Sequence, residues 1–135
     1  MSRSVEVSHY MVERPVTVHA DDTVLDAARK ILEYEVSGAC VVDENHNLLG
    51  MLSELDCLRA IVERIFEAGQ EDAGTVRDIM TANVNTNEPG EQIIDVAAEM
   101  LKKGHRRRPI VDGGKLAGQV TCRQILKAIK DFAGP

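Results

Sequence analysis

Ser53 and Asp56 are the residues whose types and spacing most readily support chemistry. They follow the apolar segment 48–52, which indicates a strand that runs into a helix. A hydroxyl followed three residues later by a carboxylate is typical of a helix N-cap with an acidic first turn, where both groups lie beside exposed backbone N–H groups. Such a corner suits a polar ligand that is rich in hydroxyl groups. The same pattern also serves as a simple helix cap, and the motif alone leaves both interpretations open.

This corner occurs twice in the chain. The chain aligns with itself at an offset of 69 residues, which falls to 68 from Gly50 and Gly118 onward. The lost residue falls in a turn, where a change in length is tolerated best. In the second copy Thr121 and Gln124 stand at the positions of Ser53 and Asp56. The repeat favours a role for the corner beyond capping a helix.

Each copy shows the same order of secondary structure. Apolar residues at helical spacing predict a helix over 23–34 and another over 92–103. Extended segments and strand pairs are predicted over 16–18, 38–42, 48–52, 84–86, 109–111 and 116–120. Gly113 and Gly114 follow Asp112 and predict a tight hairpin, since both central residues of such a turn need a positive φ. The sequence therefore predicts an α/β (α+β) fold built from two β-α-β-β-α repeats.

The two copies define the expected domain organisation. We expect the first repeat with the N-terminal segment over 1–66, a polar linker over 67–75 and the second repeat over 76–135. Each repeat has about 50 residues in its predicted elements, which is too few for a secure fold of its own. We therefore expect the two repeats to pack against each other as one module.

The composition argues against several classes of function. The 135 residues carry a formal net charge of −6, which disfavours a nucleic-acid partner or an anionic membrane surface. Two Phe, two Tyr and no Trp leave little aromatic surface for stacking bases. No apolar run is long enough to span a bilayer, and the N-terminus lacks the apolar region of a secretory signal. We expect a cytoplasmic protein without a membrane or nucleic-acid partner.

Neither a metal site nor an enzymatic site is indicated. Cys40, Cys57 and Cys122 lie far apart without a C-x-x-C pair, as is typical of small core residues in a reducing compartment. The histidines outside the basic run show no ligand spacing. Glu54 and Asp56 project about 100° apart on a helix, with no nucleophile nearby in the sequence. We expect a protein without metal, required cofactor or catalytic activity.

The ordered set of motifs resembles a pair of cystathionine-β-synthase (CBS) domains. The motifs that carry the resemblance are 14–18, 41–43, 50–52 with Ser53-x-x-Asp56, 78–81, 109–112 and Gly118-x-x-Thr121. The resemblance implies a pseudo-twofold pair of α/β units with a central cleft. In relatives this cleft binds AMP, ADP, ATP or S-adenosylmethionine and regulates an attached or partner protein. The resemblance also implies a homodimer that forms through the helices.

The resemblance assigns a ligand-binding role to residues of both copies. Ser53 and Asp56 match the family's Ser/Thr-x-x-Asp signature, in which the carboxylate accepts hydrogen bonds from both ribose hydroxyls. In the first copy the positions that let the base approach are matched by Ser37, Gly38 and Ala39, and the segment that lines the other side of the base is matched by Val16 and Thr17. In the second copy the matching positions are Asn85, Thr86, Arg106, Arg107, Arg108, Thr121 and Gln124. Because Gln124 replaces the aspartate, we expect a weaker ribose contact there and two unequal sites.

The run 105–108 is the only dense basic segment in this acidic chain. The family places phosphate-facing residues here, and Arg106 and Arg107 match those contacts more closely than Arg108. Alternation along a strand sends Arg106 and Arg108 to one face and Arg107 to the other. Guanidinium groups bind phosphate through paired donors, which favours a nucleotide over uncharged adenosine. A solvated strand edge, with basic residues that prevent aggregation, is the alternative interpretation.

These observations predict a stand-alone regulatory module that senses an adenine nucleotide and acts on an unidentified protein. The segment 55–66 carries a wider apolar band than one core-facing stripe needs, and its repeat mate 125–132 carries a similar one. These bands favour a twofold homodimer. A dimeric interaction scaffold without a small-molecule ligand and a metal-binding protein are the two alternatives.

Overall fold

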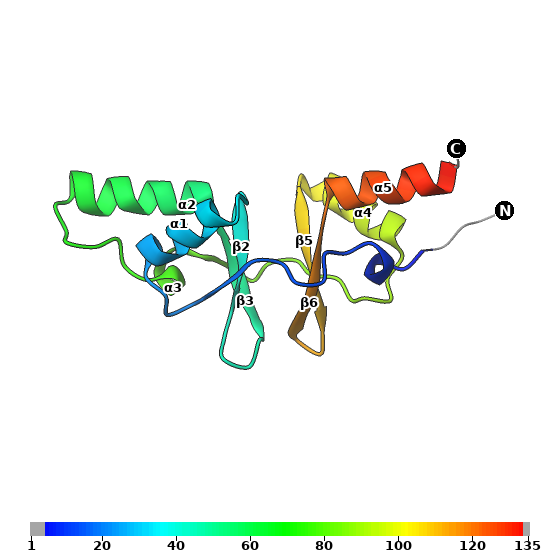
Figure 1. Cartoon of the computed structure of the whole chain (residues 1–135), viewed down its shortest axis with the longest axis horizontal. Coiled ribbons are helices and arrows are strands. Elements are labelled where there is room, and N and C mark those ends of the chain that lie inside the picture. The colour runs from blue at the N-terminus through cyan, green and yellow to red at the C-terminus, as the bar shows by residue number, and fades with distance from the viewer. Residues whose placement is uncertain (1–4, 134–135) are drawn as a thin grey trace. The chain divides into compact units, whose positions relative to one another are not determined.

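The computed structural model describes residues 5–133, which form two compact units (Figure 1). The first-repeat unit consists of Val16–Val84, and the second-repeat unit combines 5–15 with 85–133. This division differs from the repeat boundaries expected along the chain, because the segment before each repeat belongs to the unit of the other repeat.

The first-repeat unit contains a four-stranded sheet in the order β1-β2-β3-β4. The strands are β1 (Thr17–His19), β2 (Gly38–Val42), β3 (Leu48–Ser53) and β4 (Thr81–Ala82). The helices are α1 (Val24–Glu33), α2 (Glu54–Ala60), the π-helical segment η2 (Ile61–Glu67) and α3 (Val76–Ile79). Strand β1 pairs with β2 in parallel, and the other neighbouring strands pair antiparallel. The helix predicted over 23–34 and the strands predicted over 38–42 and 48–52 are confirmed.

The second-repeat unit contains the antiparallel hairpin of β5 and β6. Its elements are the short 3-10 helix η1 (Val7–His9), α4 (Ile93–Lys103), β5 (Arg107–Asp112), β6 (Lys115–Thr121) and α5 (Cys122–Ala133). The predicted hairpin turn is confirmed, since φ is 58° at Gly113 and 83° at Gly114. Helix α4 begins and ends within one residue of the prediction.

The extended segment predicted around 84–86 does not form a strand in the structure. Asn87, which follows it, pairs with the hairpin through an isolated parallel bridge to Ile110. Its N–H donates to the Pro109 carbonyl at 3.2 Å, and its carbonyl accepts from Val111 N at 2.9 Å. Pro89, two residues later, has no N–H to extend this pairing.

Both units are completed by the segments that they exchange. Val7 is fully buried in the second-repeat core, where it packs with Ile93 and Val96. Val76 is fully buried in the first-repeat core beside Val24. These apolar contacts remove both segments from water. The core of each repeat therefore depends on a segment that precedes the other repeat in the sequence.

Glycines at matching positions of the two repeats leave room for the backbone of these segments. A Cβ atom on Gly50 would lie 2.5 Å from the carbonyl oxygen of Thr81. A Cβ atom on Gly118 would lie 2.7 Å from the carbonyl oxygen of Val12. Val12 also pairs with Gln119 through backbone hydrogen bonds of 2.8 and 3.0 Å. The repeated glycine is therefore required by the close approach of another backbone.

Each unit has its own hydrophobic core. The buried residues of the first core are Val18, Ala20, Val24, Ala27, Ile31, Ala39, Val41, Leu52, Cys57, Ala60, Ala73 and Val76. Those of the second are Val7, Ile93, Val96, Met100, Ile110, Val120, Ile125 and Ala128. Among residues 5–133, no helix is long and apolar enough to cross a membrane.

Candidate functional site

The corner at Ser53 and Asp56 lies where β3 ends and α2 begins. Ser53 N donates to Asp56 Oδ2 at 2.9 Å, and Asp56 N donates to Ser53 Oγ at 3.0 Å. This reciprocal pair is a capping box, which satisfies two backbone donors at the helix start. The other carboxylate oxygen, Asp56 Oδ1, has no hydrogen-bond partner in the part of the chain that the structure describes. The corner thus acts as a helix cap and keeps one charged acceptor available.

Two further predicted site residues meet this corner through their backbone. Glu54 N donates to the Ser37 carbonyl at 2.9 Å, and Gly38 lies opposite Ser53 in the β2–β3 register. The start of β2 is therefore joined to the start of α2. The next residue, Ala39, is 1% exposed and packs in the core. Its side chain is a core group, so only its backbone can serve a ligand.

Val16 and Thr17 lie on the far side of β2 from the corner. The Val16 carbonyl accepts a hydrogen bond from Cys40 N at 3.2 Å, and Thr17 lies opposite Cys40 in the parallel β1–β2 register. Lys30 Nζ donates to the Thr17 carbonyl. Both residues are half-buried, and the Val16 side chain packs against the first-repeat core.

Burial also determines the chemistry of the cysteine beside the corner. Cys57 follows Asp56 in α2 and is 3% exposed. Desolvation, together with the negative charge of Asp56, raises the pKa of the Cys57 thiol. This thiol therefore stays protonated near neutral pH and behaves as a small core group.

The second corner has a different hydrogen-bond pattern. Gln124 Oε1 accepts from both the backbone N and the Oγ1 of Thr121, each at 2.7 Å. The only acceptor oxygen of this amide is therefore occupied, and its NH₂ group is left to donate. Cys122 Sγ donates to the Arg106 carbonyl at 3.7 Å, which joins the start of α5 to the residue before β5. Unlike Asp56, Gln124 offers no free acceptor to a ribose.

The structure separates the three arginines of the basic run. Arg106 is exposed and precedes β5, so strand alternation does not apply to it and it does not share a face with Arg108. Arg107 is half-buried and lies opposite Thr121. Arg108 is 0% exposed and is a core residue. The alternative interpretation of the basic run as a solvated strand edge is therefore wrong for Arg108.

Arg108 is held by a polar cluster inside the second-repeat unit. Its Nη1 donates to Asn87 Oδ1 and to Glu99 Oε1, each at 2.7 Å, and its Nη2 lies 3.2 Å from His105 Nδ1. The hydrogen bond from Arg108, opposed by desolvation, holds the pKa of Glu99 below its usual range. In the repeat alignment Ala39 stands at the position of Arg108. The second repeat thus replaces a small core residue with a buried cation.

A signal for this burial was present in the sequence. Arg108 and Ile110 are two residues apart, so they project to the same face of a strand. Since Ile110 is 0% exposed, that face is the core face. The prediction grouped Arg108 with its charged neighbours instead of with the apolar residues that follow it.

Thr86 lies in the second-repeat unit beside the Arg108 cluster. It is half-buried and directly precedes Asn87. The neighbouring Asn85 is exposed, and its Oδ1 accepts a hydrogen bond from Lys103 Nζ at 2.9 Å. Within the described residues no group of three or more His, Cys, Asp or Glu side chains could hold a metal ion.

The fold and its repeated strand-to-helix corner define a tandem α/β repeat protein. The family model for the CBS domain matches residues 7–63 and 76–131. The chain therefore belongs to the CBS-domain family.

Solved structures share this fold over nearly the whole chain. CBSX2 in complex with AMP is 27% identical, with a TM-score of 0.84, and the match covers 95% of this chain and 98% of that one. A second matching structure is that of the CBS-pair protein CBSX2 from Arabidopsis thaliana. The CBS domain pair of protein MJ0100, in complex with 5′-methylthioadenosine and S-adenosyl-L-methionine, is 25% identical with a TM-score of 0.79. That match covers 94% of this chain and 97% of the other.

Curated relatives are longer proteins. An uncharacterized protein of Methanocaldococcus jannaschii is 31% identical over 123 residues, which are 91% of this chain and 42% of the relative. Inosine-5′-monophosphate dehydrogenase of Nitrosopumilus maritimus is 36% identical over 118 residues, which are 85% of this chain and 22% of the enzyme. The chain thus spans less than half the length of these two relatives.

Proposed function

We propose that this chain is a regulatory module that binds an adenine nucleotide or S-adenosylmethionine through the corner at Ser53 and Asp56. The observation that carries the proposal is the partnerless Oδ1 of Asp56, held in place by the capping box. A fixed carboxylate oxygen suits the two adjacent hydroxyls of a ribose, since both can donate to it. The complexes of CBSX2 with AMP and of MJ0100 with S-adenosyl-L-methionine support this ligand class.

The module is proposed to be non-catalytic and to act on a partner protein. The residues of the corner bind and position a ligand, but they supply no nucleophile beside a base. Cys40, Cys57 and Cys122 are present as thiols and not as disulfides, which suits the proposed reducing, cytoplasmic compartment. Arg106 and Arg107 are proposed to contribute to phosphate binding, as their match to the family implies.

Calorimetric titration with AMP, ADP and ATP is expected to find about one tight site per chain. The second corner should be weak because Gln124 exchanges a charge-assisted contact of about 1.5–3 kcal/mol for a neutral one of about 0.5–1.5 kcal/mol. That difference corresponds to roughly a tenfold loss of affinity. Affinity should rise with the number of phosphates and fall with salt.

The variant Gln124→Asp is expected to strengthen a second site in the same titration. An aspartate restores a carboxylate with one oxygen for Thr121 N and another for a ribose. Two equal tight sites in the unaltered chain would contradict this assignment. If AMP, ADP, ATP and S-adenosylmethionine all fail to bind, the interaction scaffold is the better description.

Exposed apolar side chains support a proposed homodimer. On α2 and η2, Ile61 and Ile65 pack against the core, whereas Leu58 is 59% and Phe66 77% exposed. Leu55 and Val62 are also exposed on these segments, as are Leu126 and Ile129 on α5. The wide apolar band is thus divided between the core and the surface. A twofold dimer would remove the exposed part from water.

The chain is therefore expected to sediment and scatter light as a dimer at micromolar concentration. Leu58→Asp should convert it to monomers, because a carboxylate would be buried in the interface. Arg59→Asp places the same carboxylate one position along the helix, at an exposed polar residue, and should leave the dimer intact. A monomeric unaltered chain, or equal dissociation in both variants, would rule out this interface.

A further inference from the structure

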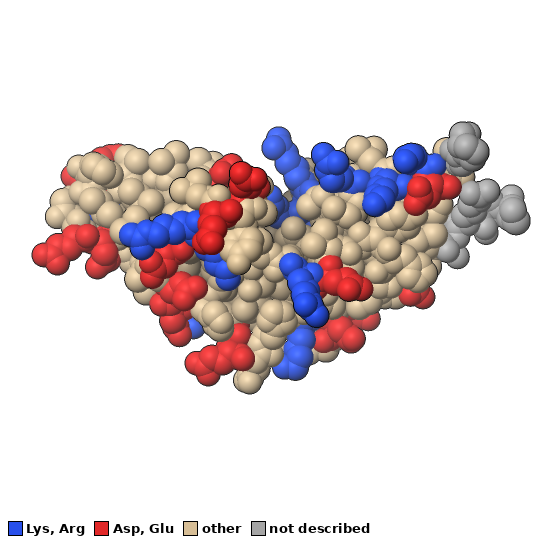
Figure 2. All heavy atoms as spheres, viewed as in Figure 1, with Lys and Arg blue, Asp and Glu red and all other residues tan. Residues whose placement is uncertain are grey.

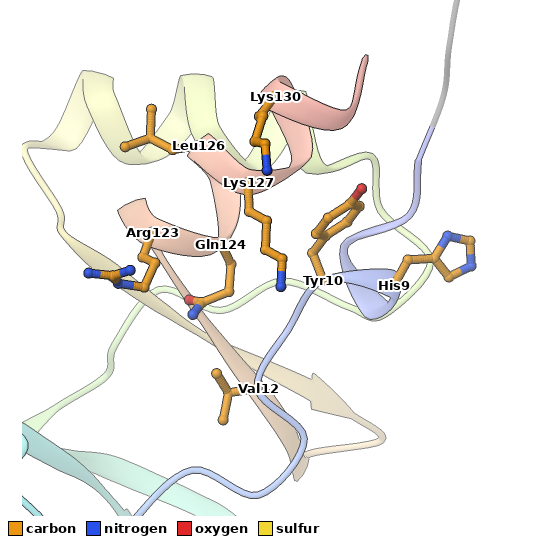
Figure 3. A pocket seen from close by; sticks show the side chains of 8 residues that line it. All are labelled: His9, Tyr10, Val12, Arg123, Gln124, Leu126, Lys127 and Lys130. Atoms are coloured by element: carbon orange, nitrogen blue, oxygen red, sulfur yellow. The ribbon is translucent and has the colours of Figure 1, made fainter. Parts of the chain in front are cut away.

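A groove lies between α5 and the N-terminal segment of the second-repeat unit (Figure 3). Its volume is about 910 Å³. Tyr10 and Val12 line it from the N-terminal segment, and Arg123, Gln124, Lys127 and Lys130 line it from α5. In Figure 3 the Lys127 side chain extends between Gln124 and Tyr10. The groove lies within one unit, and it does not include Ser53 or Asp56 but shares Gln124 with the second corner.

The three cations of the groove share one face of α5. Arg123, Lys127 and Lys130 follow one another at spacings of four and three residues, which places them along the same side of a helix. Within residues 5–133 none of the three side chains forms an ion pair or a hydrogen bond. Like charges at these spacings disfavour the helix by about 0.2–0.5 kcal/mol per pair. An anion in the groove would relieve this repulsion.

The polar groups beside these cations also favour an anion. The oxygen of Gln124 is occupied by Thr121, so its amide presents N–H donors to the groove. The nearby carboxylate of Asp131 accepts the hydroxyl hydrogen of Tyr10, and this hydrogen bond raises the pKa of the tyrosine. Asp131 keeps its negative charge in this contact, but it does not line the groove, where Arg123, Lys127 and Lys130 supply three positive charges.

The charge of the chain is distributed unevenly between the two units. The described part of the second-repeat unit has 10 Lys and Arg against 8 Asp and Glu, whereas the first-repeat unit has 5 against 14. Figure 2 shows Lys and Arg side chains gathered over the region of α5. An anion would therefore be steered toward the second-repeat unit, even though the whole chain has a net charge of −6.

We propose that this groove binds a chain of two or more phosphate groups through Arg123, Lys127 and Lys130. The first and last of these cations are seven positions apart in the sequence, which corresponds to about 10 Å along a helix axis. A chain of phosphates can contact the whole row at once, whereas a single phosphate would require the side chains at both ends to bend toward it. Guanidinium and ammonium groups both bind phosphate oxygens, and the guanidinium does so through paired donors. The proposal needs neither adenine nor ribose, and so goes beyond the nucleotide site at Asp56.

Calorimetric titration of the full chain with inorganic tripolyphosphate tests this proposal. Binding is expected at low salt and should weaken as salt is added. Lys127→Gln combined with Lys130→Gln should lower the affinity about tenfold or more, because two charge-assisted contacts are lost. The matched control, Arg59→Gln combined with Lys102→Gln, removes the same charge from exposed positions outside the groove and should change the affinity by less than about twofold.

The failure of this proposal can be distinguished from failure of the nucleotide site. Asp56→Asn should leave tripolyphosphate binding unchanged, whether or not it affects AMP. Absence of tripolyphosphate binding, or equal losses in the groove variant and its control, would overturn the proposal. Displacement by ATP would assign the phosphate chain to a free nucleotide, and displacement by vesicles carrying phosphatidylinositol bisphosphate would assign it to a lipid headgroup. Displacement by neither would also overturn it.

Discussion

Arg108→Ala is expected to lower the free energy of unfolding by about 3–5 kcal/mol. The side chain is 0% exposed, so truncation leaves a cavity that its neighbours fill only in part. It also leaves the buried amide of Asn87 without the donor that now lies 2.7 Å from its oxygen. Since small proteins are stable by only about 5–15 kcal/mol, this is a large share of the total. Urea unfolding followed by circular dichroism measures the change.

Two variants separate the possible causes of that loss. Arg106→Ala removes the same charge from an exposed position and is expected to change stability by less than about 0.5 kcal/mol. Arg108→Met keeps much of the buried volume without the charge, so it should recover the part of the loss that comes from the cavity but not the part that comes from the unpaired Asn87 oxygen. Equal losses in Arg106→Ala and Arg108→Ala would contradict the core role of Arg108.

Asp56→Asn is expected to remove the rise in melting temperature that the proposed binding of AMP should produce. In the unaltered chain, AMP at one hundred times its dissociation constant should add about 2.7 kcal/mol of stability, which is roughly 10 °C for a domain of this size. Asparagine keeps an oxygen that can accept from Ser53 N, so the helix cap survives. It loses the second, charged oxygen that the proposed ribose contact requires. Differential scanning fluorimetry with and without AMP measures both effects.

The same unit provides a matched control for this experiment. Thr75 and Asp78 form a second capping box at the start of α3, with Thr75 N donating to Asp78 Oδ2 at 3.1 Å. Asp78→Asn makes the same chemical change in the same motif outside the proposed site, and the response to AMP should persist. Asp56→Ala also removes the hydrogen bond from Ser53 N but keeps the one from Asp56 N to Ser53 Oγ, so stability without ligand should fall by about 0.5–1.5 kcal/mol. A full AMP response in Asp56→Asn would refute the ribose contact.

Local sequence patterns were sufficient to predict most of the secondary structure and the Ser53 corner. The stripe over 23–34, the Gly113-Gly114 turn and the Ser53-x-x-Asp56 cap each depend on residues at most a few positions apart. Interactions of this range are encoded in spacing, because helix and strand periods determine which neighbours meet. The repetition of these patterns also predicted two similar units.

Only the tertiary structure decided which segments complete each unit. Val7 is fully buried by elements that lie far after it in the sequence. Val76 is fully buried by elements that lie before it. The repeat pattern is the same whether each such segment packs on its own repeat or on the other. The sequence shows that Gly50 and Gly118 are repeated residues. It does not show which backbone segment packs against each glycine.

Tertiary contacts likewise decided which individual side chains are buried. Arg108 is buried because Asn87 and Glu99, 21 and 9 residues away, supply oxygens inside the unit. On η2, Ile65 packs against the core while its neighbour Phe66 is 77% exposed. The sequence determined that these residues are basic or apolar and which local element they occupy. Their burial depends on groups brought together by the fold, because a charge or an apolar surface is stabilised by its spatial neighbours.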